Sequence, residues 1–419
     1  MYRFLTHIKN RNFLRLWVAQ LISQFGDRIH QLALVGLVAE KASSSPMGLA
    51  KLMAFTIIPV FVVQPFAGAW VDRWDRRMTL FVCDIFRGVL VLLIPTIFMF
   101  GNSMIPIYII VFLVFCFSRF YIPAKMSIIP DLVDEDNLLA ANSLVSTTGM
   151  LAFVIGCALG GFFIDWWGAR TGFFIDSATF FVSAIVVFSI DMSKSLLKQE
   201  VIVSAKQVVK IKKTIWREIK DGFDYLKEHK EIRFIIDMLF VLLAAAGAVY
   251  VVIIIFVQEA FHSVTKHLGI LAVCVGVGLL LGAVGYGKFG KRFMWAKTIF
   301  FCLIFGGVML IIFALVVYNY PNIFVSMLLS LLLGFIIGPI FIASNTIVHI
   351  VSDEQMRGKV FSALEIVIHF AFLSSMFISS WLAGIVGRLW ILIFVGIIIT
   401  FIGIVGFIRM GKGRLAFPV

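Results

Sequence analysis

Long apolar runs separated by short polar segments follow one another along the whole chain of 419 residues. About 20 residues of α-helix cross the roughly 30 Å hydrocarbon core of a bilayer, so each run is long enough to span a membrane. We predict twelve membrane-spanning helices, over residues 13–38, 49–71, 79–100, 105–124, 138–164, 170–191, 233–258, 267–287, 293–318, 321–349, 360–386 and 389–409. Short connections, such as residues 101–104, require neighbouring helices to run antiparallel.

A single long hydrophilic segment, residues 192–232, interrupts this pattern and separates two halves of six spans, residues 1–191 and 233–419. Within it, apolar residues recur at helical spacing opposite lysines and arginines. This pattern predicts an amphipathic helix on the anionic inner leaflet of the membrane. A strut that links the halves is the simpler interpretation, and a regulatory site is the alternative.

The two halves carry traces of an internal duplication. A shift of 215 residues places the basic cluster at 73–77 over Lys288, Lys291 and Arg292, whereas Asp72 falls on Gly287. Parallel repeats of this kind form two pseudo-symmetric bundles with a substrate site near the membrane midplane between them. The sequence therefore predicts an all-α membrane protein with twelve transmembrane helices in two six-helix bundles.

Composition and charge agree with a polytopic membrane protein. Hydrophobic residues make up 61% of the chain, charged residues 14%, and the mean hydropathy is +1.04. A net charge of +13 would suggest nucleic acid in a soluble protein, but 28 of the 36 lysines and arginines, Lys125 included, fall on one side of the predicted topology and 5 on the other. The positive-inside rule makes this side the cytoplasm, with both termini on it. We expect the lipid bilayer as a partner and no nucleic acid.

The five cysteines all fall in predicted spans, at spacings typical of neither a disulfide framework nor a metal site. We expect no metal and no cofactor. Sequence motifs typical of enzymes and of ATP-driven pumps are also absent from the sequence. A membrane enzyme would need a clustered nucleophile and base, and an ATP-driven pump would need a phosphate-binding glycine loop. Neither pattern occurs, and a non-transporting membrane sensor is a further, weaker alternative.

The first predicted span carries one polar stripe. Gln20, Gln24, Asp27 and Gln31 are separated by four, three and four residues, so they share one helix face, with Arg28 beside it. An ionisable side chain at the centre of a membrane costs about 2.5 to 3.5 kcal/mol even on insertion-based scales. Asp27 should therefore either face a water-filled cavity or form a static ion pair with a basic residue of another helix.

Other ionisable residues also fall inside predicted spans. Glu365 and His369 lie one turn apart, and such groups can exchange protons near neutral pH when burial shifts them, which makes the two residues candidates for proton coupling. Hydrogen-bonded packing is the alternative for His369. Asp84 and Arg87, at positions i and i+3, are most simply a local ion pair.

A short basic loop lies between the second and third spans. Its pattern G-x-x-x-D-R-x-x-R-[RK] comprises Gly68, Asp72, Arg73, Arg76 and Arg77. It resembles the loop between spans 2 and 3 of the major facilitator superfamily of secondary transporters. The resemblance implies a gating latch on the cytoplasmic side, with Asp72 against the N-terminal end of the eleventh span, where the helix dipole favours an anion.

A ridge of small residues runs along the fifth span. Gly156, Gly160 and Gly161, with Ala152 and Cys157, are similar to the antiporter signature G-x-x-x-G-P-x-x-G-G of the same superfamily, although alanine and cysteine replace its first glycine and its proline. Helix packing of the small-xxx-small kind is the alternative role.

Further matches indicate a branch of the superfamily. Several segments resemble the bacterial exporters that include macrolide-efflux and enterobactin-export proteins, namely residues 12–17 leading to Gly26-Asp27, 122–125, 129–132, 141–142 and 216–225. Residues 123–125 and 141–142 also resemble the lysophospholipid transporter branch. The resemblance implies a monomeric, proton-coupled efflux antiporter for a small amphipathic molecule in the bacterial cytoplasmic membrane, working by alternating access. A lysophospholipid flippase of the same fold is the alternative.

Overall fold

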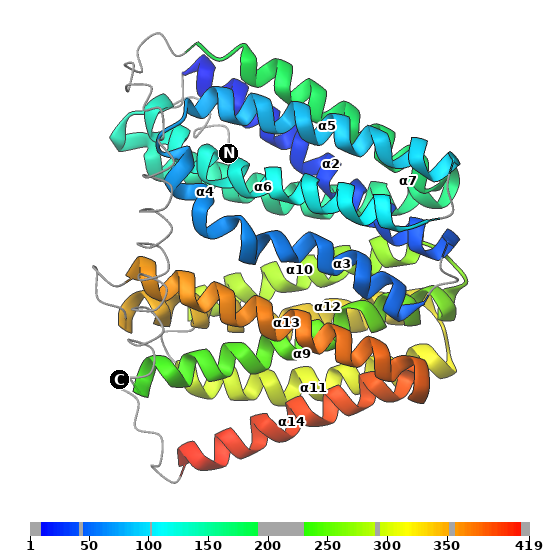
Figure 1. Cartoon of the computed structure of the whole chain (residues 1–419). Helices are drawn as coiled ribbons and strands as arrows, with labels where there is room; N and C mark the ends of the chain where they lie inside the picture. Colours follow the sequence, from blue (N-terminus) through cyan, green and yellow to red (C-terminus); the bar gives the residue numbers. More distant parts are fainter. Residues whose placement is uncertain are drawn as a thin grey trace. The chain divides into compact units, whose positions relative to one another are not determined.

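A computed structural model describes residues 10–41, 45–100, 103–191, 230–289, 294–351 and 357–411 (Figure 1). These residues form helices and no strand. The helices are α2 (Arg11–Lys41), α3 (Pro46–Val62), α4 (Gln64–Val71), α5 (Arg76–Phe100), α6 (Ile105–Leu132), a short 3₁₀ helix (Glu135–Asn137), α7 (Leu138–Phe188), α9 (Lys230–Phe261), α10 (Lys266–Phe289), α11 (Trp295–Asn319), α12 (Ile323–Val351), α13 (Arg357–Val386) and α14 (Arg388–Gly411).

The predicted twelve spans are found in these helices. The second span consists of α3 and α4 together, and α7 holds the fifth and sixth spans, which meet at Gly168 in a non-helical conformation with φ 79° and ψ 164°. Among the described residues, nine helices are long and apolar enough to cross a membrane, with α7 counted once. The helix α2 is absent from that set because its polar stripe lowers its hydropathy.

Most helix boundaries lie within about three residues of the sequence prediction, and two depart from it more clearly. The second span is broken at Val63, because Pro65, the second residue of α4, has no backbone N–H to continue the helical hydrogen bonds of α3. In contrast, α6 runs through Pro123 and Pro130 to Leu132, eight residues past its predicted end at 124. Membrane helices tolerate interior proline where neighbouring groups satisfy the freed carbonyls. Lys125, counted as a loop residue from the sequence, therefore lies within a helix.

The chain divides into two compact units. Unit 1 comprises Met1–Leu37 and Leu52–Arg217, and unit 2 comprises Val38–Lys51 and Glu218–Val419. The end of α2 and the start of α3 thus group with unit 2, whereas the sequence analysis placed them in the N-terminal half. Residues 192–229 of the predicted linker lie outside the described residues.

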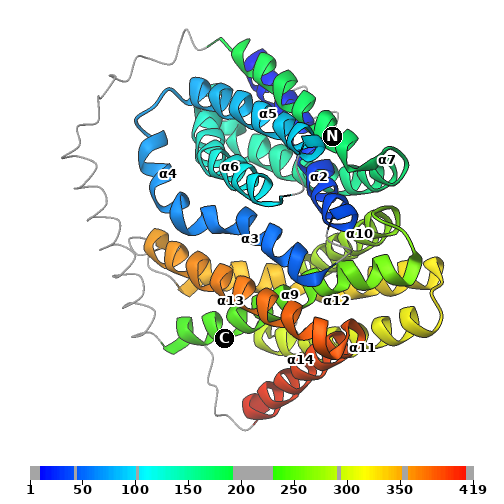
Figure 2. The same cartoon turned by 45° about the vertical axis from the view of Figure 1, so that its right-hand side comes forward.

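In unit 1, the bundle of α2, α5, α6 and α7 is held by close helix contacts (Figure 2). The small-residue ridge of α7 faces α2. A Cβ atom on Gly156 would lie 2.6 Å from Cβ of Arg28, and one on Gly160 would lie 3.2 Å from Cγ1 of Ile29. Glycine at both positions therefore allows α2 to lie close against α7.

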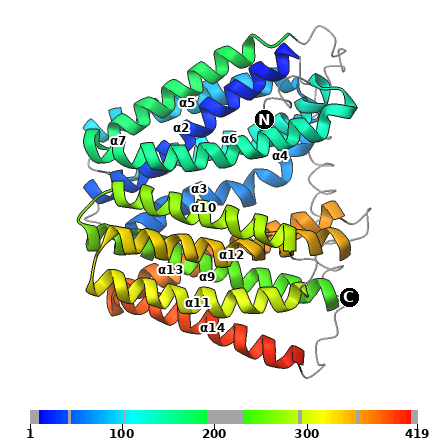
Figure 3. The ribbon, with the colours of Figure 1, turned by 180° about the vertical axis from the view of Figure 1, so that it is seen from behind.

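In unit 2, α10 packs along α12, and α9 packs against α13 and α14 (Figure 3). Gly278 and Gly282 of α10 face backbone carbonyls of Leu331 and Phe335 in α12, where a Cβ atom would lie 2.1 and 2.2 Å from the two oxygens. Backbone-to-backbone packing of this kind is typical of helices in membranes, where small residues permit close approach.

Candidate functional site

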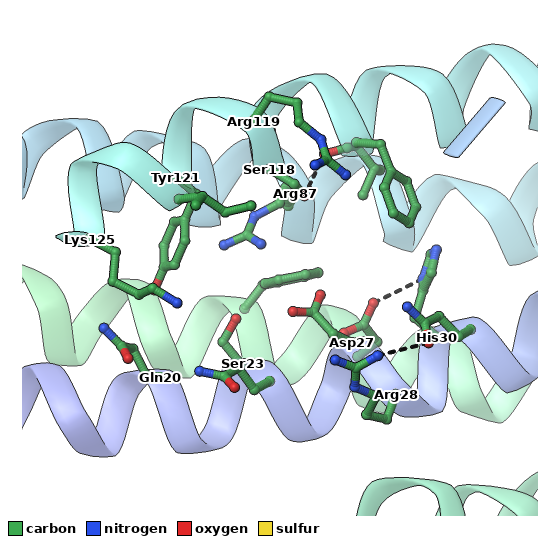
Figure 4. Close-up of a pocket in the computed structure, with 17 residues that line it drawn as sticks. Gln20, Ser23, Asp27, Arg28, His30, Arg87, Ser118, Arg119, Tyr121 and Lys125 are labelled. Carbon is green, nitrogen blue, oxygen red and sulfur yellow. Dashed lines mark hydrogen bonds and ion pairs between the residues drawn. The ribbon is translucent and has the colours of Figure 1, made fainter. Parts of the chain in front are cut away.

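Unit 1 contains a cavity of about 290 Å³ between α2, α5, α6 and the second half of α7 (Figure 4). All five residues predicted on the first span line it, namely Gln20, Gln24, Asp27, Arg28 and Gln31. They reach one cavity because their spacing of three and four residues keeps them on one side of α2.

Asp27 is half-buried at the cavity wall. Within the described residues its carboxylate has no hydrogen bond and no cation within 4 Å, so the geometry favours cavity lining over a static ion pair. Its neighbour Arg28 donates a hydrogen bond of 3.1 Å to Oε1 of Gln31 and lies over the ring of Phe153, 5.2 Å from its centre. The buried side-chain amide of Gln20 also has no hydrogen-bond partner in the described part of the chain.

The opposite wall of the cavity carries basic residues that the sequence analysis did not assign to a site. They are Arg87 on α5 and Arg119 and Lys125 on α6 (Figure 4). Arg87 forms the predicted ion pair with Asp84, and both side chains are buried. This prediction is confirmed. Arg119 donates a hydrogen bond of 3.3 Å to Gln64. A contiguous helix through Pro123 is what brings Lys125 to the cavity.

The Asp84–Arg87 pair belongs to a larger polar network. Ser183 of α7 donates a hydrogen bond of 2.7 Å to Oδ2 of Asp84. The guanidinium of Arg87 lies between two rings, 4.2 Å from the centre of Tyr121 and 4.3 Å from that of Phe180. A buried charge pair is tolerated when additional partners of this kind satisfy it.

A second buried pair joins α2 to α7. Nδ1 of His30 lies 3.0 Å from Oδ2 of Asp176, with side-chain exposures of 4% and 1%, and both residues line the cavity. The His30 ring packs edge-on against Phe173, with ring centres 5.4 Å apart. The sequence shows each residue but not their pairing, since 146 positions separate them. Gly26 is the sequence feature that indicates a close approach of α2 to another helix at this point. Any Cβ atom there would collide with Asp176 and Thr179 of α7.

The basic loop ties helix ends together within unit 1. Arg76 forms an ion pair with Asp131 of α6 and donates a 2.7 Å hydrogen bond to the carbonyl of Ser127. Arg77 donates a 2.7 Å hydrogen bond to the carbonyl of Ile190, just after α7. The loop therefore fixes the start of α5 to the ends of α6 and α7.

Asp72 and Arg73 make no such side-chain contacts with the part of the chain that the structure describes. Asp72 and Arg73 are exposed, and Asp72 ends α4 by donating its backbone N–H to the carbonyl of Gly68. Nothing lies within 4 Å of a Cβ built on Gly68. The predicted partner of Asp72, the first turn of α13, has side chains that lie outside the described residues.

Comparison with known proteins identifies the family. A family model described as "Transmembrane secretion effector", of the major facilitator superfamily, matches residues 4–407. The chain belongs to this family of transporters. The superfamily predicted from the loop and span motifs is therefore confirmed.

This transporter has bacterial relatives of low identity. It is 28% identical over 217 residues to "Uncharacterized MFS-type transporter YfiS" of Bacillus subtilis (strain 168), a match that covers 52% of this chain and about half (49%) of the relative. It is 25% identical over 353 residues to "Putative bacilysin exporter BacE" of the same organism, covering 80% of each chain. The fold is also that of a POT family transporter solved in complex with 5-aminolevulinic acid, with a TM-score of 0.72, 12% identity and 96% of each chain covered.

The two predicted coupling residues of the transporter's second half lie on α13 in unit 2. Nδ1 of His369 is 3.3 Å from Oε2 of Glu365 and 2.8 Å from the Glu365 carbonyl oxygen. Their side chains are 30% and 42% exposed, respectively, so they are far less buried than His30 and Asp176. Neither belongs to the cavity of unit 1.

The third group of predicted residues packs helices. Gly156 and Gly160 contact α2 as described above, and Gly161 is buried beside them. Within the described residues, no group of three or more His, Cys, Asp or Glu side chains could hold a metal ion. The family is one of membrane transporters, so the protein is a transporter rather than an enzyme.

Proposed function

We propose that this transporter is a proton-coupled antiporter that exports a small amphipathic molecule across the bacterial cytoplasmic membrane by alternating access. The observation that supports this proposal most directly is the position of Asp27. This half-buried carboxylate lies in a membrane helix, lines a polar cavity and has no ion-pair partner in the described residues. An ionisable group placed at such cost inside a membrane is by default a functional residue.

Two further features support the proposal. The similarity to BacE, whose name describes an exporter, favours outward transport. The basic segments favour cytoplasmic termini, as the positive-inside rule requires. In this scheme Asp27 takes up and releases the coupling proton, and the amides of Gln20 and Gln24 contact the substrate.

The buried His30–Asp176 pair supplies a second pair of proton-binding groups beside Asp27. Imidazole and carboxylate together can pass a proton over a short distance, since each can act as donor or acceptor. We assign coupling to this pair together with Asp27, ahead of the more exposed pair Glu365–His369.

Uptake into inverted membrane vesicles under an imposed pH gradient tests the proposal. The probes are 8-anilinonaphthalene-1-sulfonate, an amphipathic anion, and ethidium, an amphipathic cation. We expect an inside-acidic gradient to drive uptake of at least one probe in the wild type, and Asp27→Asn to remove the gradient-driven part because the amide binds no proton. The matched control is Asp136→Asn, an exposed aspartate outside the cavity, which should transport like the wild type.

Uptake that ignores the gradient in the wild type, or gradient-driven uptake that persists after Asp27→Asn, would contradict coupling through Asp27. The companion variant Glu365→Gln tests whether coupling depends on unit 1 or on unit 2. Gradient-driven uptake should persist in this variant if the coupling groups lie in unit 1. Movement of labelled lysophospholipid in proteoliposomes without any gradient would instead identify a flippase.

A further inference from the structure

The cavity of unit 1 carries more positive than negative charge. Four basic side chains line it, Arg28, Arg87, Arg119 and Lys125, against the carboxylates Asp27 and Asp176. Asp84 lies behind the wall and neutralises Arg87. With all three carboxylates ionised and His30 neutral, one positive charge remains. Uncompensated charge in a low-dielectric environment is unfavourable and attracts a counter-charge.

Two of these cations form no ion pair within the residues that the structure describes. Arg28 has only the Gln31 amide and the Phe153 ring as partners, and its Nε is buried without a hydrogen bond in the described residues. Lys125 is half-buried and makes no hydrogen bond or ion pair within the same part of the chain. Figure 4 shows the two side chains on opposite walls, with Asp27 beside Arg28 on α2.

Apolar side chains complete the lining, among them Val114, Phe115 and Phe180. The volume of about 290 Å³ lies near the lower end of ligand pockets, which run from roughly 300 to 1,000 Å³. The cavity therefore suits a small molecule, or the head of a larger one, that has both an apolar body and a charged group.

We propose that the transported molecule carries an anionic group, a carboxylate, sulfonate or phosphate, which Arg28 and Lys125 bind from opposite walls of the cavity. The inference rests on the proposed function in that it takes this cavity as the substrate's path. Cationic amphiphiles meet like charges at the same place and are rejected, because like-charge contacts disfavour the wrong ligand.

Binding of a matched pair of probes to the purified full-length protein in detergent tests this directly. The probes are 1-naphthylacetate and 1-naphthylmethylamine, which share a ring system and differ in charge, and isothermal titration calorimetry measures both. We expect the acetate to bind at least about tenfold more tightly than the amine. Lys125→Gln and Arg28→Gln should each weaken acetate binding by about tenfold, since each removes a charge-assisted contact.

Controls separate this effect from general charge or misfolding. Lys297→Gln makes the same charge change at an exposed lysine of unit 2 and should bind the acetate like the wild type. Lys125→Arg keeps the charge and should retain most of the binding. Melting temperatures of all variants, measured in the same detergent, exclude loss of the folded protein as the cause.

The outcomes distinguish this inference from the proposed function. Tighter or equal binding of the amine, absence of acetate binding, or acetate binding unchanged in both Lys125→Gln and Arg28→Gln would overturn it. The acetate could bind as expected while neither transport probe responds to a pH gradient. That result would contradict proton coupling but would support the preference for an anionic substrate. If an anionic lysophospholipid displaces the bound acetate, the anionic group belongs to a lipid head. If the acetate stays bound, the anionic group belongs to a soluble molecule.

Discussion

Single residues determine how closely α2 approaches α7 at the cavity. Gly26 is buried where the two helices meet, and its lack of a side chain leaves room for Asp176 to reach His30. A Cβ atom at this position would lie 2.0 Å from Oγ1 of Thr179 and 2.6 Å from Oδ1 of Asp176. Both distances are far below van der Waals contact, so α2 would have to move.

Gly26→Ala should therefore destabilise the protein by roughly 1–3 kcal/mol, the usual cost of overpacking a well-packed site. Thermal unfolding in detergent measures the change. The matched control is Gly285→Ala in α10, where nothing lies within 4 Å of the added Cβ, and alanine's better helix propensity should make it neutral or slightly stabilising. Equal melting of Gly26→Ala and wild type would show that the helices do not need this close contact.

The sequence predicts some of the cavity residues and not others, for a physical reason. Gln20, Gln24 and Asp27 can be predicted because helical spacing alone places them on one face. His30 and Asp176 cannot be paired from the sequence, because their contact depends on packing between helices 146 positions apart. The helical period in the sequence determines which residues share one face of a helix. The residues that this face contacts on other helices depend on tertiary packing.

At the scale of helices, the Asp84–Arg87 pair connects three elements of unit 1. It belongs to α5, accepts a hydrogen bond from Ser183 of α7 and lies against Tyr121 of α6. Removing one charge of a buried pair leaves the other without compensation, which is much more costly than removing both.

Asp84→Asn should accordingly lower the stability by about 3–5 kcal/mol, because Arg87 stays charged and buried. The double variant Asp84→Leu with Arg87→Met should regain most of this loss, since neither charge is then buried. Thermal unfolding of the two variants in one detergent gives the comparison. A double variant that melts below Asp84→Asn would contradict this account of the pair.

Helix ends were predicted less well than helix number. Twelve apolar runs suffice to count the spans, because each run must cover the thickness of the bilayer. The predicted fourth span ends at 124, whereas α6 continues to Leu132 through Pro123 and Pro130, which a membrane helix tolerates where neighbouring groups satisfy the freed carbonyls. That error moved Lys125 into a loop and removed a cavity cation from the predicted site.

At the scale of the whole molecule, the transporter consists of two helical units, and the described cavity belongs to the first. Its hydrophilic face on α2 and the basic wall on α5 and α6 form a polar interior inside an apolar chain. In the proposed cycle this interior opens to the two sides of the membrane in turn. The central claim is thus that the Gln24–Asp27 face of α2 meets water from both sides.

Thiol labelling of Gln24→Cys measures this accessibility directly. The five native cysteines, all in helices, are first replaced by serine or alanine. A membrane-impermeant maleimide is then applied to right-side-out and to inverted vesicles, with the fully buried Ala19→Cys on the same helix as the control. The account predicts labelling of Gln24→Cys from both sides and none of Ala19→Cys. Protection of Gln24→Cys from either side would contradict it.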